Sequence, residues 1–240
     1  MSEKPKQIIA IGGGGFYRDG ENLALERYIL QQTNAVSPRV AFVPTASGEP
    51  DNYVASFYTA FLRLGCRPSV LSFFKRTPEL RSALLDQDVI YVGGGNTKTL
   101  LAVWRDWGVP EILREAWETG VVLTGVSAGA ICWFEQGLTD SFADGLRPFD
   151  CLGFLPGSCC PHYDGEPQRR PSYHRLLAKG EISAGLALED WTAVHFKGPE
   201  IHRVIASRSG ARVYSMRSVY GSVQEVPLAV DYLPSPQSAQ

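Results

Sequence analysis

The segment VVLTGVSAGA, residues 121–130, indicates more about the fold than any other stretch of the chain. A short apolar run precedes Ser127, which stands in the order Gly-Val-Ser-Ala-Gly. A strand, this pattern and then a helix form the context of a nucleophile elbow, a sharp turn that exposes a serine at the top of a sheet. The alternative is structural, with a serine that only caps the following helix. Both interpretations predict a buried strand before Ser127 and a helix after it.

Four other runs share the apolar, β-branched character of the run before Ser127. Because both faces of each run are apolar, they predict buried strands of a parallel sheet. Segments with helical spacing alternate with them, which predicts an α/β fold with a doubly wound, mostly parallel sheet flanked by helices. The expected strands are 7–14, 39–46, 67–74, 88–95 and 121–128, and the expected helices are 21–33, 50–64, 97–105, 110–119 and 171–180.

The C-terminal third predicts extra strands, partly antiparallel, at one end of this sheet. Segments 185–198, 202–217 and 221–233 alternate in polarity and are separated by turn residues. Segment 140–170 is rich in Gly, Pro and Cys without periodicity, so we expect an irregular and functional stretch there. The tail, 234–240, is expected to fray. The length also fits two small domains, but without a linker the prediction is one α/β domain over residues 1–240.

Composition excludes several classes of function. The 23 basic and 25 acidic residues give a net charge of −2, which argues against nucleic acid or an anionic membrane as a partner. No run of 18 apolar residues is present, and the first apolar run is too short for a signal peptide, so we expect a cytoplasmic protein. Five cysteines without a CxxC spacing suit free thiols in a reducing compartment. Cys159, Cys160 and His162 lack a second ligand pair, so no metal site is expected.

Three glycine-rich turns follow predicted strands, at 12–15, 93–95 and 125–129. Ligands of open α/β sheets bind at the carboxyl ends of the strands, where these turns lie. The turn at 93–95 opens a helix, so its free N–H groups can hold an anion or an oxyanion. The first turn does not fit GxGxxG because position 17 is Tyr17, and a nucleotide cofactor is therefore not expected.

A serine nucleophile needs a base and an acid to orient it. Among the four histidines His162 is the best candidate base, because it lies in the irregular segment between Pro161 and Asp164. Glu189 and Asp190 end an apolar, strand-like run, where a carboxylate can be aimed inward. The N–H of Ala128 would point at a developing oxyanion.

The motifs VGGGNT, GVSAGA, PHYD and GLALEDW, in this order, resemble the peptidase E family of serine peptidases. That family includes aspartyl dipeptidases and has cyanophycinases as relatives, and the resemblance runs from about residue 8 to residue 200. It implies a fold like that of class I glutamine amidotransferases. It also implies a triad of Ser127, His162 and an acid in the Leu-Glu-Asp segment, with an oxyanion hole from the N–H groups of Gly95 and Ala128.

The resemblance further places Asn96 and Asp140 near the substrate. The family's acid stands in Pro-Glu-Gly-Asn-Trp, whereas this chain has Ala-Leu-Glu-Asp-Trp at 187–191. We expect Glu189 as the acid, and the cyanophycinase-like pattern favours Asp190 instead. Arg169 and Arg170 are candidates to bind either an aspartate side chain or a peptide's terminal carboxylate.

The expected activity is that of a serine peptidase acting on short peptides, with Asp-X dipeptides as candidate substrates and no cofactor or metal. A cyanophycinase-like or carboxypeptidase-like hydrolase on the same triad is one alternative. A non-catalytic domain that binds a small anion is another. An amidotransferase is disfavoured because its nucleophile would be a cysteine where Ser127 stands. The resemblance also leaves a homodimer open, since members of the family are often dimers.

Overall fold

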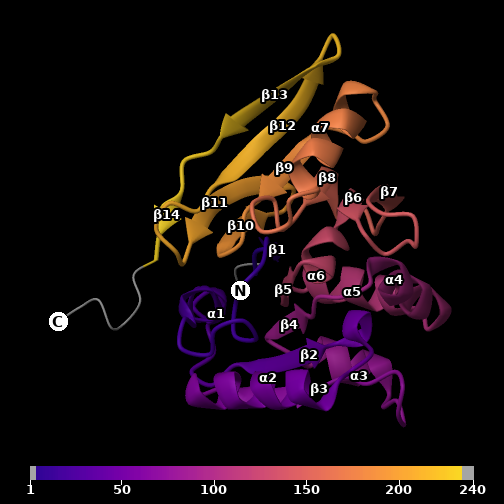
Figure 1. Cartoon of the computed structure of the whole chain (residues 1–240). Coiled ribbons are helices and arrows are strands. Elements are labelled where there is room, and N and C mark those ends of the chain that lie inside the picture. The colour runs from indigo at the N-terminus through magenta and orange to yellow at the C-terminus, as the bar shows by residue number, and fades with distance from the viewer. Residues whose placement is uncertain (1–3, 234–240) are drawn as a thin grey trace.

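The centre of the fold is a sheet whose middle strands are parallel (Figure 1). The computed structural model describes residues 4–233, so the predicted frayed tail lies outside the described residues. The strand order is β14-β11-β10-β1-β5-β4-β2-β3. The strands of this sheet are β1 (Gln7–Ile11), β2 (Arg39–Val43), β3 (Arg67–Val70), β4 (Val89–Val92), β5 (Val122–Val126), β10 (Thr192–Lys197), β11 (Glu200–Ala206) and β14 (Asp231–Tyr232).

The prediction of a mostly parallel α/β sheet is confirmed. β1 pairs in parallel with β5, β5 with β4, β4 with β2, and β2 with β3. Alternation along β1 sends Ile9 and Ile11 into one hydrophobic cluster and Ile8 and Ala10 into the other. Both faces of the strand are therefore covered, which explains why its sequence is an unbroken apolar run.

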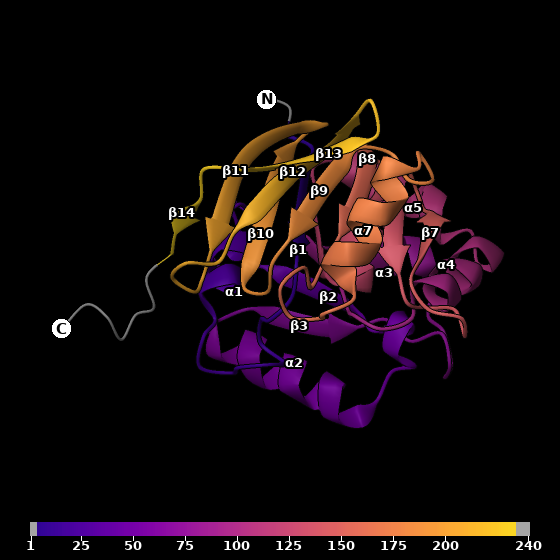
Figure 2. The same ribbon diagram turned by 45° about the horizontal axis from the view of Figure 1, so that its top comes forward.

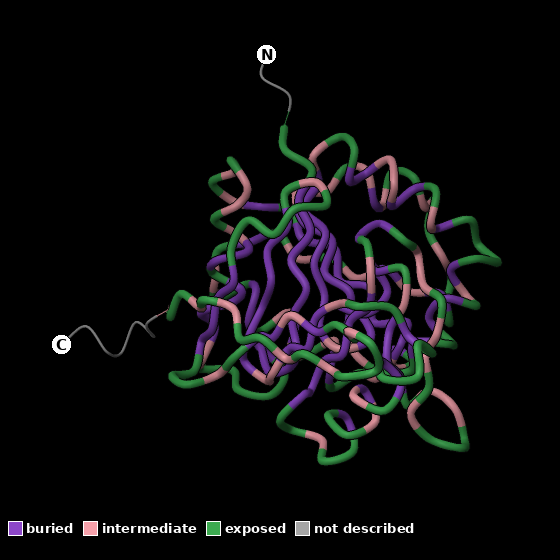
Figure 3. The backbone as a smooth tube through the Cα atoms, turned by 90° about the horizontal axis from the view of Figure 1, so that it is seen from above, coloured by how far each residue is buried: buried purple, intermediate pink, exposed green. Residues whose placement is uncertain are grey.

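Helices and a second sheet cover the two faces. α1 (Ala24–Leu30) and α2 (Asp51–Arg63) pack on the face of Ile9 and Ile11. α3 (Leu80–Leu85), α4 (Thr97–Asp106), α5 (Val109–Glu118) and the short α6 (Ala128–Ile131) contribute to the cluster on the other face. Figure 3 shows the result, with the central strands buried and the exposed backbone gathered around them.

The second sheet corrects two expectations from the sequence. Its order is β13-β12-β9-β8-β6-β7, so the C-terminal strands divide between two sheets and do not only extend one. The segment 140–170, expected to be irregular, contains two of its strands. The strands are β6 (Phe134–Thr139), β7 (Arg147–Asp150), β8 (Leu155–Cys160), β9 (Gly185–Leu188), β12 (Val213–Val219) and β13 (Ser222–Pro227).

The strand β8 was missed because its sequence, LPGSCC, has no β-branched residue and contains Pro and Gly. It is held by partners far away in sequence, since it pairs in parallel with β6 and with β9. The helix α7 (Arg169–Ala178) packs on this sheet through a third apolar cluster that includes Tyr173, and Figure 2 shows it lying along β8 and β9.

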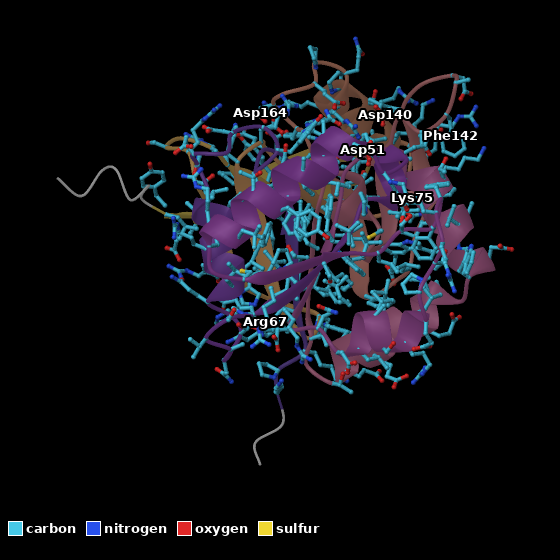
Figure 4. All side chains as sticks on the ribbon, turned by 90° about the horizontal axis from the view of Figure 1, so that it is seen from below. Asp51, Arg67, Lys75, Asp140, Phe142 and Asp164 are labelled. Atoms are coloured by element: carbon cyan, nitrogen blue, oxygen red, sulfur yellow. The ribbon has the colours of Figure 1, made fainter. Side chains whose placement is uncertain are left out.

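The loops at the carboxyl ends of the parallel strands converge on one edge of the molecule. Figure 4 shows Asp51, at the start of α2, near this edge with Asp140 and Asp164, while Arg67, the first residue of β3, lies on the opposite side. Ligands of open α/β sheets bind at the edge where the strands end. Within residues 4–233, no helix is both long and apolar enough to cross a membrane.

Candidate active site

Ser127 lies between β5 and α6 in a strained backbone conformation. Its φ of 58° and ψ of −113° lie outside the backbone conformations that residues other than glycine usually adopt. The strain is held by the sheet, because the N–H of Ser127 donates to the carbonyl of Ile11 on β1 at 3.1 Å. The side chain makes no capping hydrogen bond to α6, so the helix-capping alternative does not describe this serine.

Two backbone N–H groups beside Ser127 lack an acceptor in the part of the chain that the structure describes. They belong to Gly95, in the turn after β4, and to Ala128, the first residue of α6. The neighbouring N–H of Gly94 is already used, since it donates to the hydroxyl of Tyr53 at 3.3 Å. Gly95 has a φ of +135° and a side chain there would collide with the backbone of Ala46, so only glycine fits this position. Such a pair of free donors suits an anionic oxygen.

His162 and Asp190 form a close pair, and His162 lines the same pocket as Ser127. The Nδ1 atom of His162 lies 2.6 Å from Oδ1 of Asp190, and the side chains are 11% and 16% exposed. Burial raises the pKa of Asp190, but the hydrogen bond and attraction to His162, together with Arg18 and Arg208, outweigh it and hold the pKa below its usual value. Asp190 is therefore an anion that fixes the His162 ring and leaves Nε2 as its free nitrogen.

The loop after β1 holds both members of this pair. The N–H of His162 donates to the carbonyl of Gly12 at 3.1 Å, and the N–H of Trp191 donates to the carbonyl of Gly13 at 2.9 Å. A side chain at Gly13 would place its Cβ 2.6 Å from Nδ1 of His162 and on top of the Asp190 carboxylate. Asp164 adds a further restraint, because its Oδ1 accepts from the N–H of Asp190 at 2.8 Å.

Glu189, the expected acid, does not contact the histidine. Its Oε2 accepts from the N–H of Arg212 at 2.7 Å, and its Oε1 accepts from the hydroxyl of Tyr214 at 3.1 Å. The two carboxylates turn in opposite directions, and Trp191, which follows them, has a φ of 69°. The carboxylate beside His162 is that of Asp190, so the preference for Glu189 is corrected.

Ser127 separates two pockets. One, of about 240 Å³, contains His162 and is otherwise lined by Gly14, Tyr17, Arg18, Ser47, Pro50, Tyr53, Gly94, Gly95 and Val126. The other, of about 340 Å³, is polar and is lined by Gly95, Asn96, Asp140, Ser141, Glu166 and Arg169 as well as Ser127. Only Ser127 and Gly95 border both, so a molecule lying across the serine reaches into two chemically different spaces.

Three of the expected substrate-binding residues do line the polar pocket. Arg169 is 2% exposed and is held by Oε2 of Glu166 at 2.6 Å, the carbonyl of Leu138 at 2.7 Å and Oδ1 of Asp140 at 3.5 Å. Asn96 caps α4, because its Oδ1 accepts from the N–H of Thr99 at 2.8 Å. Asp140 is open to solvent, with a side chain that is 61% exposed.

Arg170, the fourth expected contact, is turned away from these pockets. It pairs with Glu225 on β13, and its guanidinium lies over the rings of Tyr163 and Tyr214 at 5.4 and 5.7 Å. On α7, consecutive residues point about 100° apart, so Arg169 and Arg170 cannot face the same side. Of the two arginines, only Arg169 lines a pocket beside Ser127, and a contact between it and substrate stays a prediction.

Several residues of this site were not identified from the sequence. Glu166 and Arg18 carry charges into the two pockets, and Gly13 makes room for the His162–Asp190 pair. The glycine run at 12–15 was the available signal. Its spacing does not fit a nucleotide-binding loop, and in the structure the run packs against residues from the last third of the chain.

The described residues offer no group of three or more His, Cys, Asp or Glu side chains that could hold a metal ion. Cys159 and Cys160 alternate along β8 and enter different hydrophobic clusters. They therefore do not converge on His162.

Comparison with known proteins agrees with the arrangement of the strands and turns. The chain is 52% identical over 229 residues to the uncharacterized peptidase YgaJ of Bacillus subtilis (strain 168). The aligned region covers 95% of this chain and 99% of YgaJ. It is 33% identical over 133 residues to a peptidase E of Streptomyces coelicolor, over 54% of this chain and 53% of the other. A crystal structure of a peptidase from an acI-B1 Actinobacterium shares the fold, with a TM-score of 0.68 and 20% identity over 95% of this chain and 96% of that one.

These similarities define the protein as a peptidase. The sequence model of Peptidase family S51 matches residues 8–204. The chain belongs to this family, and the match spans Ser127, His162 and Asp190.

Proposed function

We propose that the protein is a serine peptidase of short peptides, with Ser127 as nucleophile, His162 as base and Asp190 as the acid that orients it. One observation carries the proposal. A strained serine that caps no helix shares a pocket with a histidine whose Nδ1 is held by a largely shielded carboxylate. Strain of this kind persists where the surroundings enforce it and is concentrated at functional sites.

In the proposed reaction, Oγ of Ser127 bonds to the carbonyl carbon of the peptide while its proton passes to Nε2 of His162. The oxyanion that forms accepts from the N–H groups of Gly95 and Ala128. The C–N bond then breaks and the leaving amine takes the proton from His162. A water molecule attacks the resulting ester, gives its proton to His162, and releases the acid as the serine regains its hydrogen. Asp190 stays ionised throughout.

Labelling with a fluorophosphonate tests whether the serine is activated. We expect labelling of the native protein and none of Ser127→Ala, together with a fall in peptide hydrolysis of about 10⁴- to 10⁶-fold. A cyanophycinase-like or carboxypeptidase-like hydrolase would label in the same way and is separated by its substrates. A folded native protein that neither labels nor cleaves any short peptide would instead support a non-catalytic site for a small anion.

The charge of the polar pocket bears on the substrate. Arg169 is shared by Asp140 and Glu166, so these three side chains together carry a net charge of −1. A guanidinium already bound by two carboxylates is a poor partner for a third, whereas a peptide's free α-ammonium group complements the pocket. We therefore propose that the pocket accepts the amino end of a short peptide without requiring aspartate. Rates on Asp-Leu, Asn-Leu and Ala-Leu test this, and a strong preference for Asp-Leu that is lost in Arg169→Ala would restore the Asp-X assignment.

We also propose a cytoplasmic location. All five cysteines are free thiols, four of them buried. Burial raises the pKa of the thiols of Cys66 and Cys160, to about 11 and about 12, so these groups stay protonated and inert. Unpaired thiols suit a reducing compartment, and cell fractionation tests the assignment.

A further inference from the structure

The two pockets on either side of Ser127 correspond to the two sides of the bond that is cut, if the proposed function holds. His162 must hand a proton to the leaving amine, so the part of the peptide that leaves first lies on the side of this histidine. That side is the pocket of about 240 Å³ lined by Tyr17, Arg18 and Tyr53. The polar pocket with Arg169 then receives the part that forms the acyl-enzyme.

Arg18 is the only residue of the His162 pocket with a permanently charged side chain. Within residues 4–233 its guanidinium makes no ion pair and no hydrogen bond. Arg169, in contrast, has three partners. Its charge nevertheless reaches the site, because it contributes to the low pKa of Asp190. An unpaired guanidinium beside the leaving amine is free to bind an anion.

The backbone of the loop fixes where Arg18 stands. The N–H groups of Arg18 and Asp19 both donate to the carbonyl of Gly15, at 3.0 and 3.1 Å, so the chain turns tightly just after the glycine run. Next to it, the ring of Tyr17 lies 4.3 Å from that of Tyr53. The two aromatic rings and Pro50 contribute apolar surface to the same pocket. The pocket therefore offers one cation and an apolar surface, which matches a single amino-acid residue that ends in a carboxylate.

We propose that Arg18 binds the C-terminal carboxylate of the peptide in the His162 pocket and so limits the number of residues after the cleaved bond. This proposal rests on the proposed function and names the substrate class of the same site. A volume of about 240 Å³ is below the range of about 300 to 1,000 Å³ typical of sites for drug-sized ligands. A C-terminal carboxylate bound at Arg18 ends the peptide close to the cleaved bond, which makes the enzyme a dipeptidase or a carboxypeptidase and not an endopeptidase.

The test compares Ala-Leu with its C-terminal amide in the native protein and in two variants. In the native protein, amidation removes the anion and should raise KM by about 10- to 100-fold, with a smaller effect on kcat. Arg18→Ala should show that raised KM with the free acid and should no longer distinguish acid from amide. Arg18→Lys, which keeps the charge but not the planar fork, should fall between the two.

Arg208→Ala is the matched control. Arg208 also attracts Asp190, but it lies over the ring of Trp191 at 4.5 Å and does not line the His162 pocket. The variant should therefore keep the full difference between acid and amide. Loss of that difference in Arg208→Ala as well would mean that a general charge effect on Asp190, and not binding at Arg18, is responsible.

Other outcomes separate the two proposals. If native protein cleaves acid and amide with equal KM, Arg18 does not bind the carboxylate, while the serine peptidase proposal stands. If the protein cleaves neither peptide and its serine does not label with a fluorophosphonate, the proposed function itself fails. Labelling rates of the Arg18 variants show whether the serine and the histidine remain intact, so a damaged fold is not mistaken for a lost carboxylate contact.

Discussion

Two histidines of this protein, His162 and His195, lie in opposite settings. His195 is fully buried in β10, in the middle of the central sheet, and both of its ring nitrogens are used. The hydroxyl of Tyr28 lies 2.8 Å from Nδ1, and Oε1 of Gln7 lies 3.1 Å from Nε2, which fits a neutral ring that accepts from the tyrosine and donates to the glutamine. His162 lies in a loop with a φ of 54°, and only its Nδ1 is engaged by a side chain.

The two regions differ in whether their hydrogen-bond donors and acceptors already have partners. In the sheet, both ring nitrogens of His195 have partners, and burial lowers its pKa to about 3 and keeps it uncharged. At the ends of the strands, strained residues leave particular donors and acceptors without partners, as at Gly95, Ala128 and Nε2 of His162. A histidine is available for chemistry where its surroundings use one nitrogen and leave the other.

Removing the carboxylate that holds His162 would test the comparison most severely. We expect Asp190→Asn to lower kcat by about 10³- to 10⁴-fold, because the amide no longer stabilises the charged ring or selects its tautomer. Glu189→Gln is the matched control, since its carboxylate contacts Arg212 and Tyr214. Steady-state kinetics on Ala-Leu check both. The opposite ranking of the two variants would return the role of the acid to Glu189.

Crowding the same pair should have a smaller effect. The methyl group of Gly13→Ala would displace the His162 ring or the Asp190 carboxylate by a fraction of an ångström or more, and we expect kcat to fall by about 10²-fold. In Gly20→Ala the nearest atom to the new Cβ, the carbonyl oxygen of Phe16, is 3.9 Å away, so that variant should keep its activity. Equal activities of the two variants would show that the loop after β1 does not position the pair.

Protonation of the buried His195 should change the stability of the protein and not its catalytic rate. The folded state resists protonation of His195 until about pH 3, whereas the unfolded chain binds the proton near pH 6.5. The unfolded state therefore gains protons first, and stability falls as the pH drops through this range, by about 2 to 3 kcal/mol between pH 6.5 and pH 4.5.

Urea unfolding at these two pH values measures the effect of His195. His195→Gln lacks this contribution, so the stability advantage of the native protein over the variant should be smaller at pH 4.5 than at pH 6.5 by about 2 to 3 kcal/mol. His202→Gln should keep most of the contribution, because burial contributes more than the charge of His202 to the low pKa of His195. An equal stability difference between the native protein and His195→Gln at both pH values would contradict this account.

Glu26, which contacts the loop after β1, should change the stability with pH in the opposite direction to His195. This is the smallest effect that we expect. Glu26 is fully buried, its Oε1 accepts from the N–H of Phe16 at 2.8 Å, and burial raises its pKa to about 7. The folded state therefore holds this proton more tightly than the unfolded chain, and stability falls as the pH rises from about 4.5 to about 7.

Glu26→Gln keeps an acceptor for Phe16 and cannot ionise. We expect it to be more stable than the native protein by roughly 1 to 3 kcal/mol at pH 8, with little difference at pH 4.5. Thermal unfolding at the two pH values checks this. An unchanged difference between the proteins across the pH range would show that Glu26 does not titrate there.

The central strands were predicted well from the sequence because each is an apolar run that is buried on both faces of the sheet. The sequence did not predict β6, β7 or β8. The residues of β8 favour no strand, and its pairing depends on β6 and β9, which lie elsewhere in the chain. Ser127 and His162 were identified from a turn motif and a loop setting. The choice between Glu189 and Asp190 was beyond the sequence, because it depends on the positive φ of Trp191 and on contacts to Arg212 and Tyr214.

The pairing of β1 with β10 also determines when the site comes into existence. β1 is made first, yet its antiparallel partner begins at Thr192, after His162 and Asp190 have been added. A growing chain that has just passed Asp190 therefore contains Ser127, the glycine turns and both members of the pair, but not the strand that pairs with β1. The loop after β1, whose carbonyl groups accept from the N–H groups of His162 and Trp191, is secured by its antiparallel partner only once β10 has been synthesised.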